Sequence, residues 1–206
     1  TTNLQHASAG SPAIVLDAAG DATYAGTHDF SAATVTGIPV TEGLTHINTT
    51  TFSAVSSVSL DDVFTGTYEN YKLVIDGTTS VSANFYFRLR VGGTDNSASV
   101  YSYIALRSFT GSAANQVLDN TRTEYILSAG SFGADGASMM CDIFSPQLAV
   151  NTRANSLVSA YYSSNAATGL TALTHRSATS FDGMTIYPSA GTFTGTIRVY
   201  GYKNGA

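Results

Sequence analysis

The side chains best suited to recognition chemistry are tyrosines and arginines that recur at alternating positions in two stretches, 85–91 and 99–107. Both residue types are enriched in recognition surfaces, because each combines a large, rigid contact area with a polar tip. The six residues are Tyr86, Arg88, Arg90, Tyr101, Tyr103 and Arg107. A face of this kind can stack on sugar rings or pack against another protomer, with guanidinium planes over aromatic rings. It can equally be the ordinary outer face of a sheet, since tyrosine is a favoured strand residue.

Alternation along the chain predicts that these six side chains share one face. Neighbouring residues on a strand point to opposite sides of the sheet. The large apolar residues of the two stretches therefore lie opposite the tyrosines and arginines, and they are Phe85, Phe87, Leu89, Val91, Val100, Ile104 and Leu106. If the two stretches pair as a hairpin and bury these apolar residues together, the register brings the Tyr–Arg set onto the other side.

The sequence contains no recognisable catalytic motif. It lacks a Gly-x-Ser-x-Gly nucleophile elbow, a Gly-x-x-x-x-Gly-Lys phosphate loop and a His-Glu-x-x-His metal motif. The histidines are far apart in the chain, at His6, His28, His46 and His175. The adjacent carboxylates Asp61 and Asp62 favour capping of a short helical turn over glycoside hydrolysis, which needs two carboxylates facing each other across a substrate. We therefore expect a protein that is not an enzyme.

Two acidic stretches are the candidate cation sites. Asp95 with Asn96, and Asp17 with Asp21, could bind calcium, but an Asx turn explains each pair without an ion. The single cysteine, Cys141, follows two methionines in an apolar run, which predicts a buried thiol. We therefore expect no metal and no cofactor.

The chain of 206 residues carries little charge. Charged residues make up 11% of the sequence and the formal net charge is −5, whereas typical soluble domains contain about 25% charged residues. Its polarity comes instead from 28 threonines and 25 serines. The scattered basic residues exclude the clustered patch that nucleic-acid binding requires, and the chain lacks an apolar run long enough for a membrane-spanning helix.

Ten candidate strands follow from runs of β-branched and aromatic residues between turns rich in Gly, Asn, Asp and Ser. They span residues 51–59, 71–77, 84–91, 99–107, 122–127, 138–144, 155–162, 169–175, 184–187 and 193–202. Short strands at this spacing, without a long apolar stripe of period 3.6, predict an all-β domain over residues 49–206. Its expected architecture is an antiparallel β-sandwich or jelly roll.

Residues 1–48 form a thinner segment. Residues 14–24 predict a short hairpin, because an apolar run meets a Gly-containing turn and the alternation then resumes. The rest of the segment has few large side chains, and an isolated two-stranded hairpin is marginally stable in water. We expect other surfaces to cover this stalk or attachment segment, and the economical candidate is further copies of itself.

Three segments of the C-terminal domain resemble tailed-bacteriophage fibre proteins, in particular those of cyanophages. They are residues 183–203 (GMTIYPSAGTFTGTIRVYGYK), 60–75 (LDDVFTGTYENYKLVI) and 88–95 (RLRVGGTD). Residues 14–26 are similar to the short hairpin units that precede the tips of such fibres. The resemblance implies a homotrimeric virion fibre with a C-terminal β-sandwich head, whose N-terminal segment attaches to other virion proteins.

The resemblance also implies a function in host attachment, with a head that recognises the host surface and in particular its polysaccharide. The candidate binding places are loops at the free end of the head, over residues 92–97, 161–165 and 108–115. The tip residues singled out there are Asp95, Asn96, Tyr161, Tyr162 and Asn165. The alternative is a capsid decoration protein or short head fibre with a structural role and no receptor binding. In either case we expect a place on the virion, as an appendage or on the capsid surface, with no bound nucleic acid and no membrane insertion.

Overall fold

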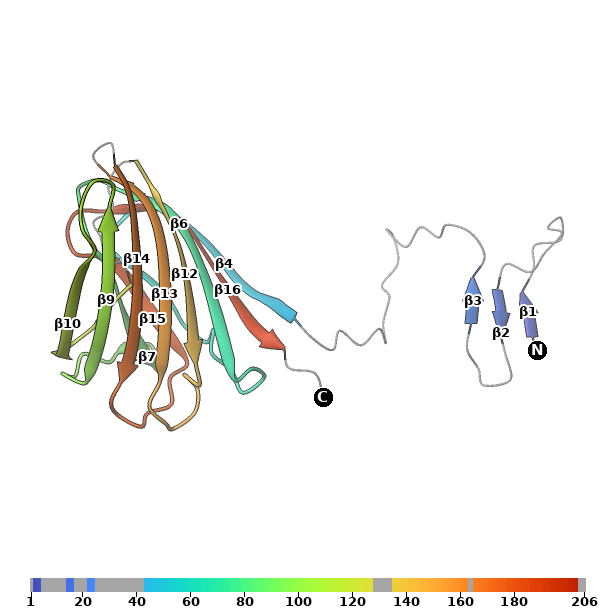
Figure 1. Cartoon of the computed structure of the whole chain (residues 1–206). Coiled ribbons are helices and arrows are strands. Elements are labelled where there is room, and N and C mark those ends of the chain that lie inside the picture. Colours follow the sequence, from blue (N-terminus) through green and yellow to red (C-terminus); the bar gives the residue numbers. More distant parts are fainter. Residues whose placement is uncertain are drawn as a thin grey trace. The chain divides into compact units, whose positions relative to one another are not determined.

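The computed structural model describes residues 2–4, 14–16, 22–24, 43–127, 135–162 and 165–203, and every regular element in these ranges is a β-strand (Figure 1). The chain divides into two units, Thr1–Val40 and Thr41–Ala206. In the first unit, β1 (Thr2–Leu4), β2 (Ile14–Leu16) and β3 (Ala22–Tyr24) form an antiparallel sheet in the order β1-β2-β3. The hairpin predicted over residues 14–24 is therefore confirmed as β2 and β3.

The second unit is built on an eight-stranded antiparallel sheet. Its strands, in spatial order, are β10 (Asn115–Arg122), β9 (Tyr101–Phe109), β14 (Asn165–His175), β13 (Arg153–Tyr162), β12 (Ala137–Phe144), β6 (Asn70–Thr79), β16 (Phe193–Lys203) and β4 (Gly43–Val55). A smaller antiparallel sheet packs against it and consists of β11 (Tyr125–Ile126), β7 (Phe85–Val91), β15 (Gly183–Pro188) and β5 (Val58–Leu60), with β8 (Thr94–Asp95) paired to β7. The predicted all-β, antiparallel β-sandwich is confirmed.

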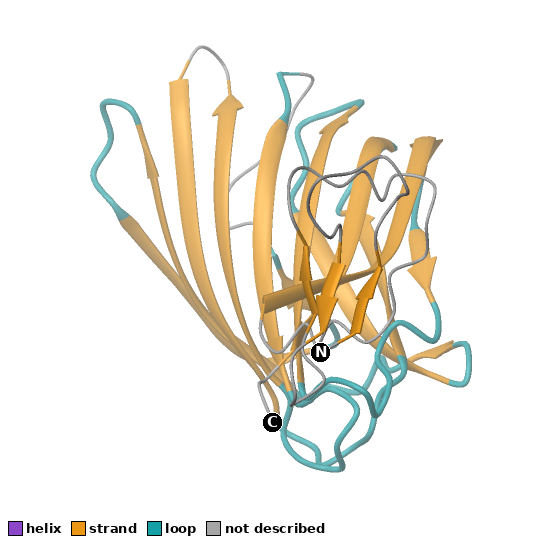
Figure 2. Cartoon of the chain, turned by 90° about the vertical axis from the view of Figure 1, so that its right-hand side faces the viewer, coloured by secondary structure: helices purple, strands orange, loops and turns teal. Residues whose placement is uncertain are grey.

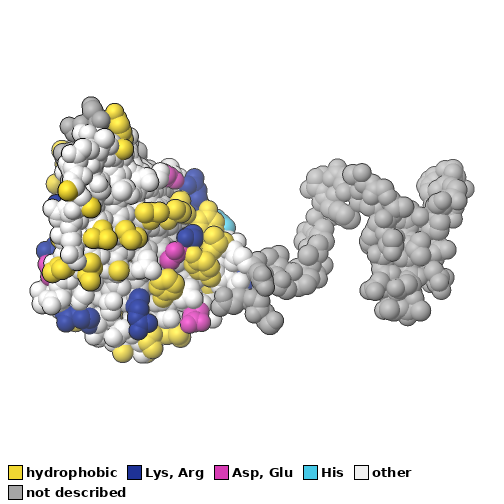
Figure 3. Space-filling model, viewed as in Figure 1, with side chains coloured by type: hydrophobic (Ala, Val, Ile, Leu, Met, Phe, Trp, Pro, Cys, Tyr) yellow, Lys and Arg dark blue, Asp and Glu magenta, His cyan; other side chains and the backbone are white. Residues whose placement is uncertain are grey.

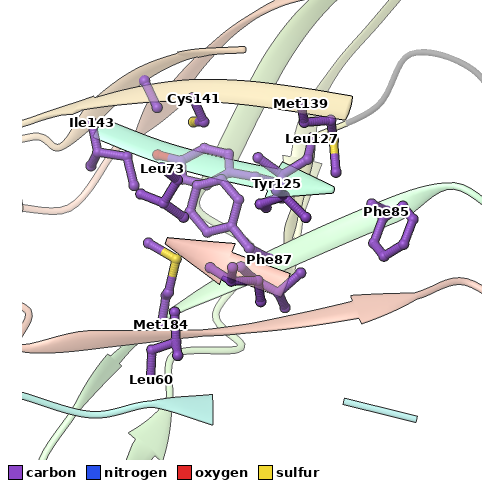
Figure 4. Packing of buried hydrophobic residues seen from close by; sticks show 14 of the residues in the cluster. Leu60, Leu73, Phe85, Phe87, Tyr125, Leu127, Met139, Cys141, Ile143 and Met184 are labelled. Carbon is purple, nitrogen blue, oxygen red and sulfur yellow. The ribbon is translucent and has the colours of Figure 1, made fainter. Parts of the chain in front are cut away.

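The hydrophobic core lies between the two sheets (Figure 4). Strict alternation of buried and partly exposed residues along β6, β7 and β12 places every second side chain in the core. From the large sheet the core receives Leu73, Met139, Cys141 and Ile143, and from the small sheet Leu60, Phe85, Phe87 and Met184. Cys141 is a buried free thiol, as its apolar neighbours predict.

The sandwich has two unlike ends (Figure 2). The register pairs Lys203 with Gly43, so β16 finishes where β4 begins. We call this the proximal end, because the N-terminal segment joins the sandwich there. Strand register places residues 80–84, 110–114 and 189–192, together with the β13–β14 turn, at the opposite end, which we call the distal end.

Three differences from the predicted boundaries change which sheet or segment a stretch belongs to. The stretch 51–59 is not one strand, because the chain leaves the large sheet at β4 and enters the small sheet at β5. The positive φ of Ala54 (51°) accompanies this change of sheet. The stretch 122–127 divides between β10 and β11 for the same reason. Finally, β4 begins at Gly43, so residues 43–48 pair with β16 instead of belonging to the N-terminal segment.

Candidate functional site

The single Tyr–Arg face predicted from the sequence does not exist. The stretches 85–91 and 99–107 belong to different sheets, β7 to the small sheet and β9 to the large one. In β9 the expected faces are also exchanged, because Tyr101 and Tyr103 are buried while Ile104 and Leu106 are exposed. Arg107 lies on the same side of β9 as the two tyrosines, near the distal end.

Tyrosine can occupy the core of β9 because its polar tip finds backbone partners there. The hydroxyl of Tyr101 donates to the carbonyl oxygen of Asn96 at 2.7 Å and accepts from the amide of Leu89 at 3.2 Å. The Tyr101 ring packs edge-on against Tyr125 and His175, with centroids 4.6 and 4.8 Å away. Burial raises the pKa of Tyr101, so its hydroxyl stays protonated. The residue holds the fold together and does not face a ligand.

Arg90 is a structural clamp. Its Nε forms an ion pair with Oδ1 of Asp61 at 2.7 Å, and its Nη1 donates to the Thr185 hydroxyl at 2.7 Å. The guanidinium also donates to Asp95 and to the carbonyl of Gly93. Only 12% of its side chain is exposed. Asp61 therefore forms an ion pair with Arg90. The helical turn that it was expected to cap is absent, because residues 61–64 after β5 are not helical. With its donors directed at the fold, Arg90 offers little to an external ligand.

Tyr86 and Arg88 do lie on the outer face of the small sheet, where Arg88 is held by its neighbours. Its guanidinium lies over the ring of Tyr187 at 5.3 Å and donates to Glu124 at 3.2 Å. Burial raises the pKa of Tyr187 to about 12. Burial also opposes ionisation of Glu124, but hydrogen bonds from Thr123 and Arg88 outweigh it and lower the pKa of that carboxyl. Arg88 and Glu124 thus satisfy each other, whereas the buried Tyr187 hydroxyl has no hydrogen-bond partner among the described residues.

The predicted tip residues lie at opposite ends of the sandwich. Asp95 and Asn96 are at the proximal end, so their placement at the free end is wrong. Asp95 accepts hydrogen bonds from Arg90 and from Thr185 (2.6 Å), and Asn96 accepts one from the amide of Ala98 (3.2 Å), as in an Asx turn. These contacts hold the β7–β8 hairpin, which the sequence placed at a tip because its glycines resemble a display loop.

Tyr161 and Asn165 lie at the distal end, on either side of the β13–β14 turn. Tyr161 is exposed. The side chain of Tyr162 lies outside the described residues, as do His6, His28, Asp17 and Asp21. The loop 110–114 reaches the same end, where Thr110 bonds to the carbonyl of Ala166 at the start of β14. Two of the three predicted loops are thus neighbours.

The most distinctive surface was missed from the sequence. It is a row of apolar side chains across the outer face of the large sheet, which we call the apolar row: Leu106, Leu170, Leu157, Met140 and Val74, on β9, β14, β13, β12 and β6. Each is the direct register partner of the next, and the first four are between 45% and 52% exposed. Ile104 and Leu118 extend the apolar surface on the proximal side. Figure 3 shows apolar side chains gathered across the middle of this face.

Polar groups border the apolar row. On the distal side the next row is formed almost entirely by hydroxyl side chains, namely Ser108, Thr168, Ser159, Ser138, Thr196 and Thr51, with Asp76 among them. Beside Met140 and Val74, Lys72 pairs with Asp142 at 2.7 Å and Arg198 pairs with Asp76 at 3.5 Å. A hollow at the β9–β10 edge continues the surface, with Ile104, Leu118 and Ala172 among its lining residues.

The sequence does contain a signal for this surface, but the signal contradicts the usual assumption that the larger apolar side chains of a strand face the core. Along β13 the buried inward positions are Ala154, Ser156 and Val158, whereas the larger Leu157 points outward. A pattern in which small side chains face the core and large ones face solvent predicts a second apolar contact on the outer face.

The described residues contain no group of three or more His, Cys, Asp or Glu side chains arranged to hold a metal ion. A membrane-crossing helix is likewise not found among them. Comparison with protein-family models, curated proteins and solved structures finds no match to this chain.

Proposed function

We propose that this chain is a non-enzymatic virion fibre protein of a tailed bacteriophage, assembled as a homotrimer, with a sandwich head that binds polysaccharide on the host surface. The observation that carries the proposal is the polarity of the head. The polypeptide enters at Gly43 and ends its last strand at Lys203, and these two residues are register partners at the proximal end. The distal end is therefore left to loops, as an attachment protein requires of the end that meets its receptor.

The chemistry of the distal loops suits a neutral, hydroxyl-rich ligand. Residues 80–84, 110–114 and 189–192 contain only small, hydroxyl, amide and aliphatic side chains and carry no charge. Backbone and hydroxyl groups of this kind pair with sugar hydroxyls, and the exposed ring of Tyr161 next to them supplies a stacking surface. Charged groups at this end include the carboxylates of Asp76 and Asp135, which line a hollow together with Tyr161 and can accept hydrogen bonds from sugar hydroxyls.

Binding of the purified 206-residue chain to bacterial cells, competed by their lipopolysaccharide, tests the proposal. Removing the stacking ring with Tyr161→Ala should weaken binding about tenfold or more, as truncation of an aromatic anchor does. The matched control is Leu148→Ala, which shortens an exposed side chain in the proximal loop between β12 and β13 and should leave binding unchanged.

Two outcomes would count against host recognition. Equal losses from Tyr161→Ala and Leu148→Ala would show that the distal end is not the binding end. Absence of any cell binding, together with antibody labelling of the capsid instead of a tail or fibre, would favour the capsid decoration protein or short head fibre.

A further inference from the structure

We infer that the outer face of the large sheet is the surface through which copies of this chain associate, with the apolar row buried against a second copy. The inference rests on the proposed function only for the existence of a homo-oligomer, and it names the surface that holds the head domains together. It is independent of what the distal loops bind.

The first support is continuity of the apolar row. Five strands contribute one side chain each in unbroken register, so the row is about 19 Å long at the usual strand spacing. Leu157 and Leu170 form its centre as a direct cross-strand pair. Single exposed leucines are normal on a monomer, but a contiguous apolar patch marks a surface that another protein covers.

The second support is area. The outer face spans eight strands and about eight residues along each, which gives roughly 900 Å² at standard strand dimensions. A stable protein interface needs about 800 Å² per partner. Each copy therefore has enough area on this face for a stable association, and when three chains meet around one axis the face is shared between the two neighbouring copies.

The third support is the distribution of charge, which selects a second copy over a charged partner. Lys72 with Asp142 and Arg198 with Asp76 neutralise each other within the face. The row of serine and threonine hydroxyls borders the apolar centre, so the face has the apolar core and polar rim of a protein interface. The charges beside the apolar row are thus paired, and the outward-facing Arg153 lies further toward the proximal end of β13. The apolar row is complementary to another surface of the same kind.

The β9–β10 hollow at the edge of this face has a mixed lining. It contains the apolar Ile104, Leu118 and Ala172, the buried ring of Tyr103, and the polar Ser102, Asp119, Asn120 and Thr174. The exposed aromatic ring of Tyr161, on which a sugar could stack, lies at the distal end.

The first test places a charge at the centre of the apolar row. The double variant Leu157→Lys/Leu170→Lys changes two exposed residues and should fold normally, which circular dichroism and thermal unfolding verify. Light scattering on a sizing column should show the wild-type chain as an oligomer. In the double variant the dissociation constant of that oligomer should rise roughly 30-fold or more. Val91→Lys is the control, because Val91 is about equally exposed but lies on the small sheet.

The second test measures coverage of the row directly. Met140 belongs to the apolar row, whereas Met139 and Met184 are buried in the core and serve as internal references. Peroxide converts accessible methionine to its sulfoxide, which peptide mass spectrometry quantifies. Met140 should be as resistant as the two references in the wild-type oligomer and should oxidise much faster in the double variant.

Three results would overturn the inference. One is an oligomer that keeps its wild-type affinity in the double variant, and another is rapid oxidation of Met140 in the wild-type oligomer. The third is a wild-type monomer with Met140 protected, which would assign the face to the N-terminal segment of the same chain. Loss of polysaccharide binding with an intact oligomer would count against the proposed function alone.

Discussion

Tyr101 joins the two sheets from inside the core. Its hydroxyl satisfies the amide of Leu89 and the carbonyl of Asn96, and these backbone groups have no access to replacement partners without local rearrangement. Tyr101→Phe keeps the ring but removes both bonds, so the free energy of unfolding should fall by about 1–3 kcal/mol. Denaturation in urea measures the change.

The matched control for Tyr101→Phe is Tyr161→Phe, which removes an exposed hydroxyl from the distal end. It should leave the denaturation midpoint unchanged, because water replaces the lost partner. If the two variants were equally stable, the hydrogen bonds of Tyr101 would contribute nothing to the fold.

His175 makes stability depend on pH. The side chain is buried between Tyr101 and Phe181, with Nδ1 3.0 Å from the Ser177 carbonyl and Nε2 unpartnered among the described residues. Burial lowers its pKa below the ordinary value of 6.5, and the Ser177 hydrogen bond only partly offsets this. The unfolded chain therefore takes up a proton first as the pH falls. Stability should be full above about pH 6.5 and should decline between that pH and the lower folded-state pKa.

Urea midpoints at pH 7.5, 6.5 and 5.5 test the contribution of His175. The non-titrating variant His175→Gln is less stable overall, but its loss relative to wild type should shrink at low pH. A His175→Gln deficit that is constant with pH would show that this imidazole does not titrate on unfolding.

At the scale of the strand, close backbone contact restricts the β6–β16 pair. Gly195 lies opposite Gly77, and a Cβ atom on Gly195 would come within 2.1 Å of the Asp76 carbonyl oxygen. Gly195→Ala therefore forces the two strands apart and should cost about 1–3 kcal/mol of unfolding free energy, as overpacking does. Thermal unfolding reports the loss.

Gly66→Ala is the control for Gly195→Ala, because a Cβ atom on Gly66 would have no neighbour within 4 Å. Its melting temperature should match that of the wild type. A stable Gly195→Ala protein would mean that β6 and β16 can separate without loss, contrary to the register described above.

The strands themselves were largely predictable, since β-branched and aromatic runs between turns mark β6, β7, β12 and β16 within a few residues. β10 was not, because Asn115–Arg122 is polar and lies at a sheet edge where little of it is buried. The faces of β9 were predicted the wrong way round, because the largest aliphatic residues were assigned to the core. Register and sheet membership depend on contacts between distant segments, so local alternation could not supply them.

At the scale of the whole head, the two ends and the outer face have different tasks in the account developed above. The proximal end receives the N-terminal segment, the distal end presents loops with an exposed carboxylate, Asp135, and the outer face of the large sheet is available to a second copy. The sequence suggested tip positions for Tyr161, Asn165 and the loop 110–114, which do lie together at the distal end. The apolar row did not follow from the sequence, because it emerges when Leu106, Leu170, Leu157 and Met140 are brought into register across four strands.

Native mass spectrometry of the unmodified 206-residue chain over a dilution series measures self-association without any substitution. We expect a homo-oligomer that persists at micromolar concentration, with the trimer at three times the 21.4 kDa protomer mass. A species of 21.4 kDa at every concentration would contradict both the shared stalk and the buried apolar row.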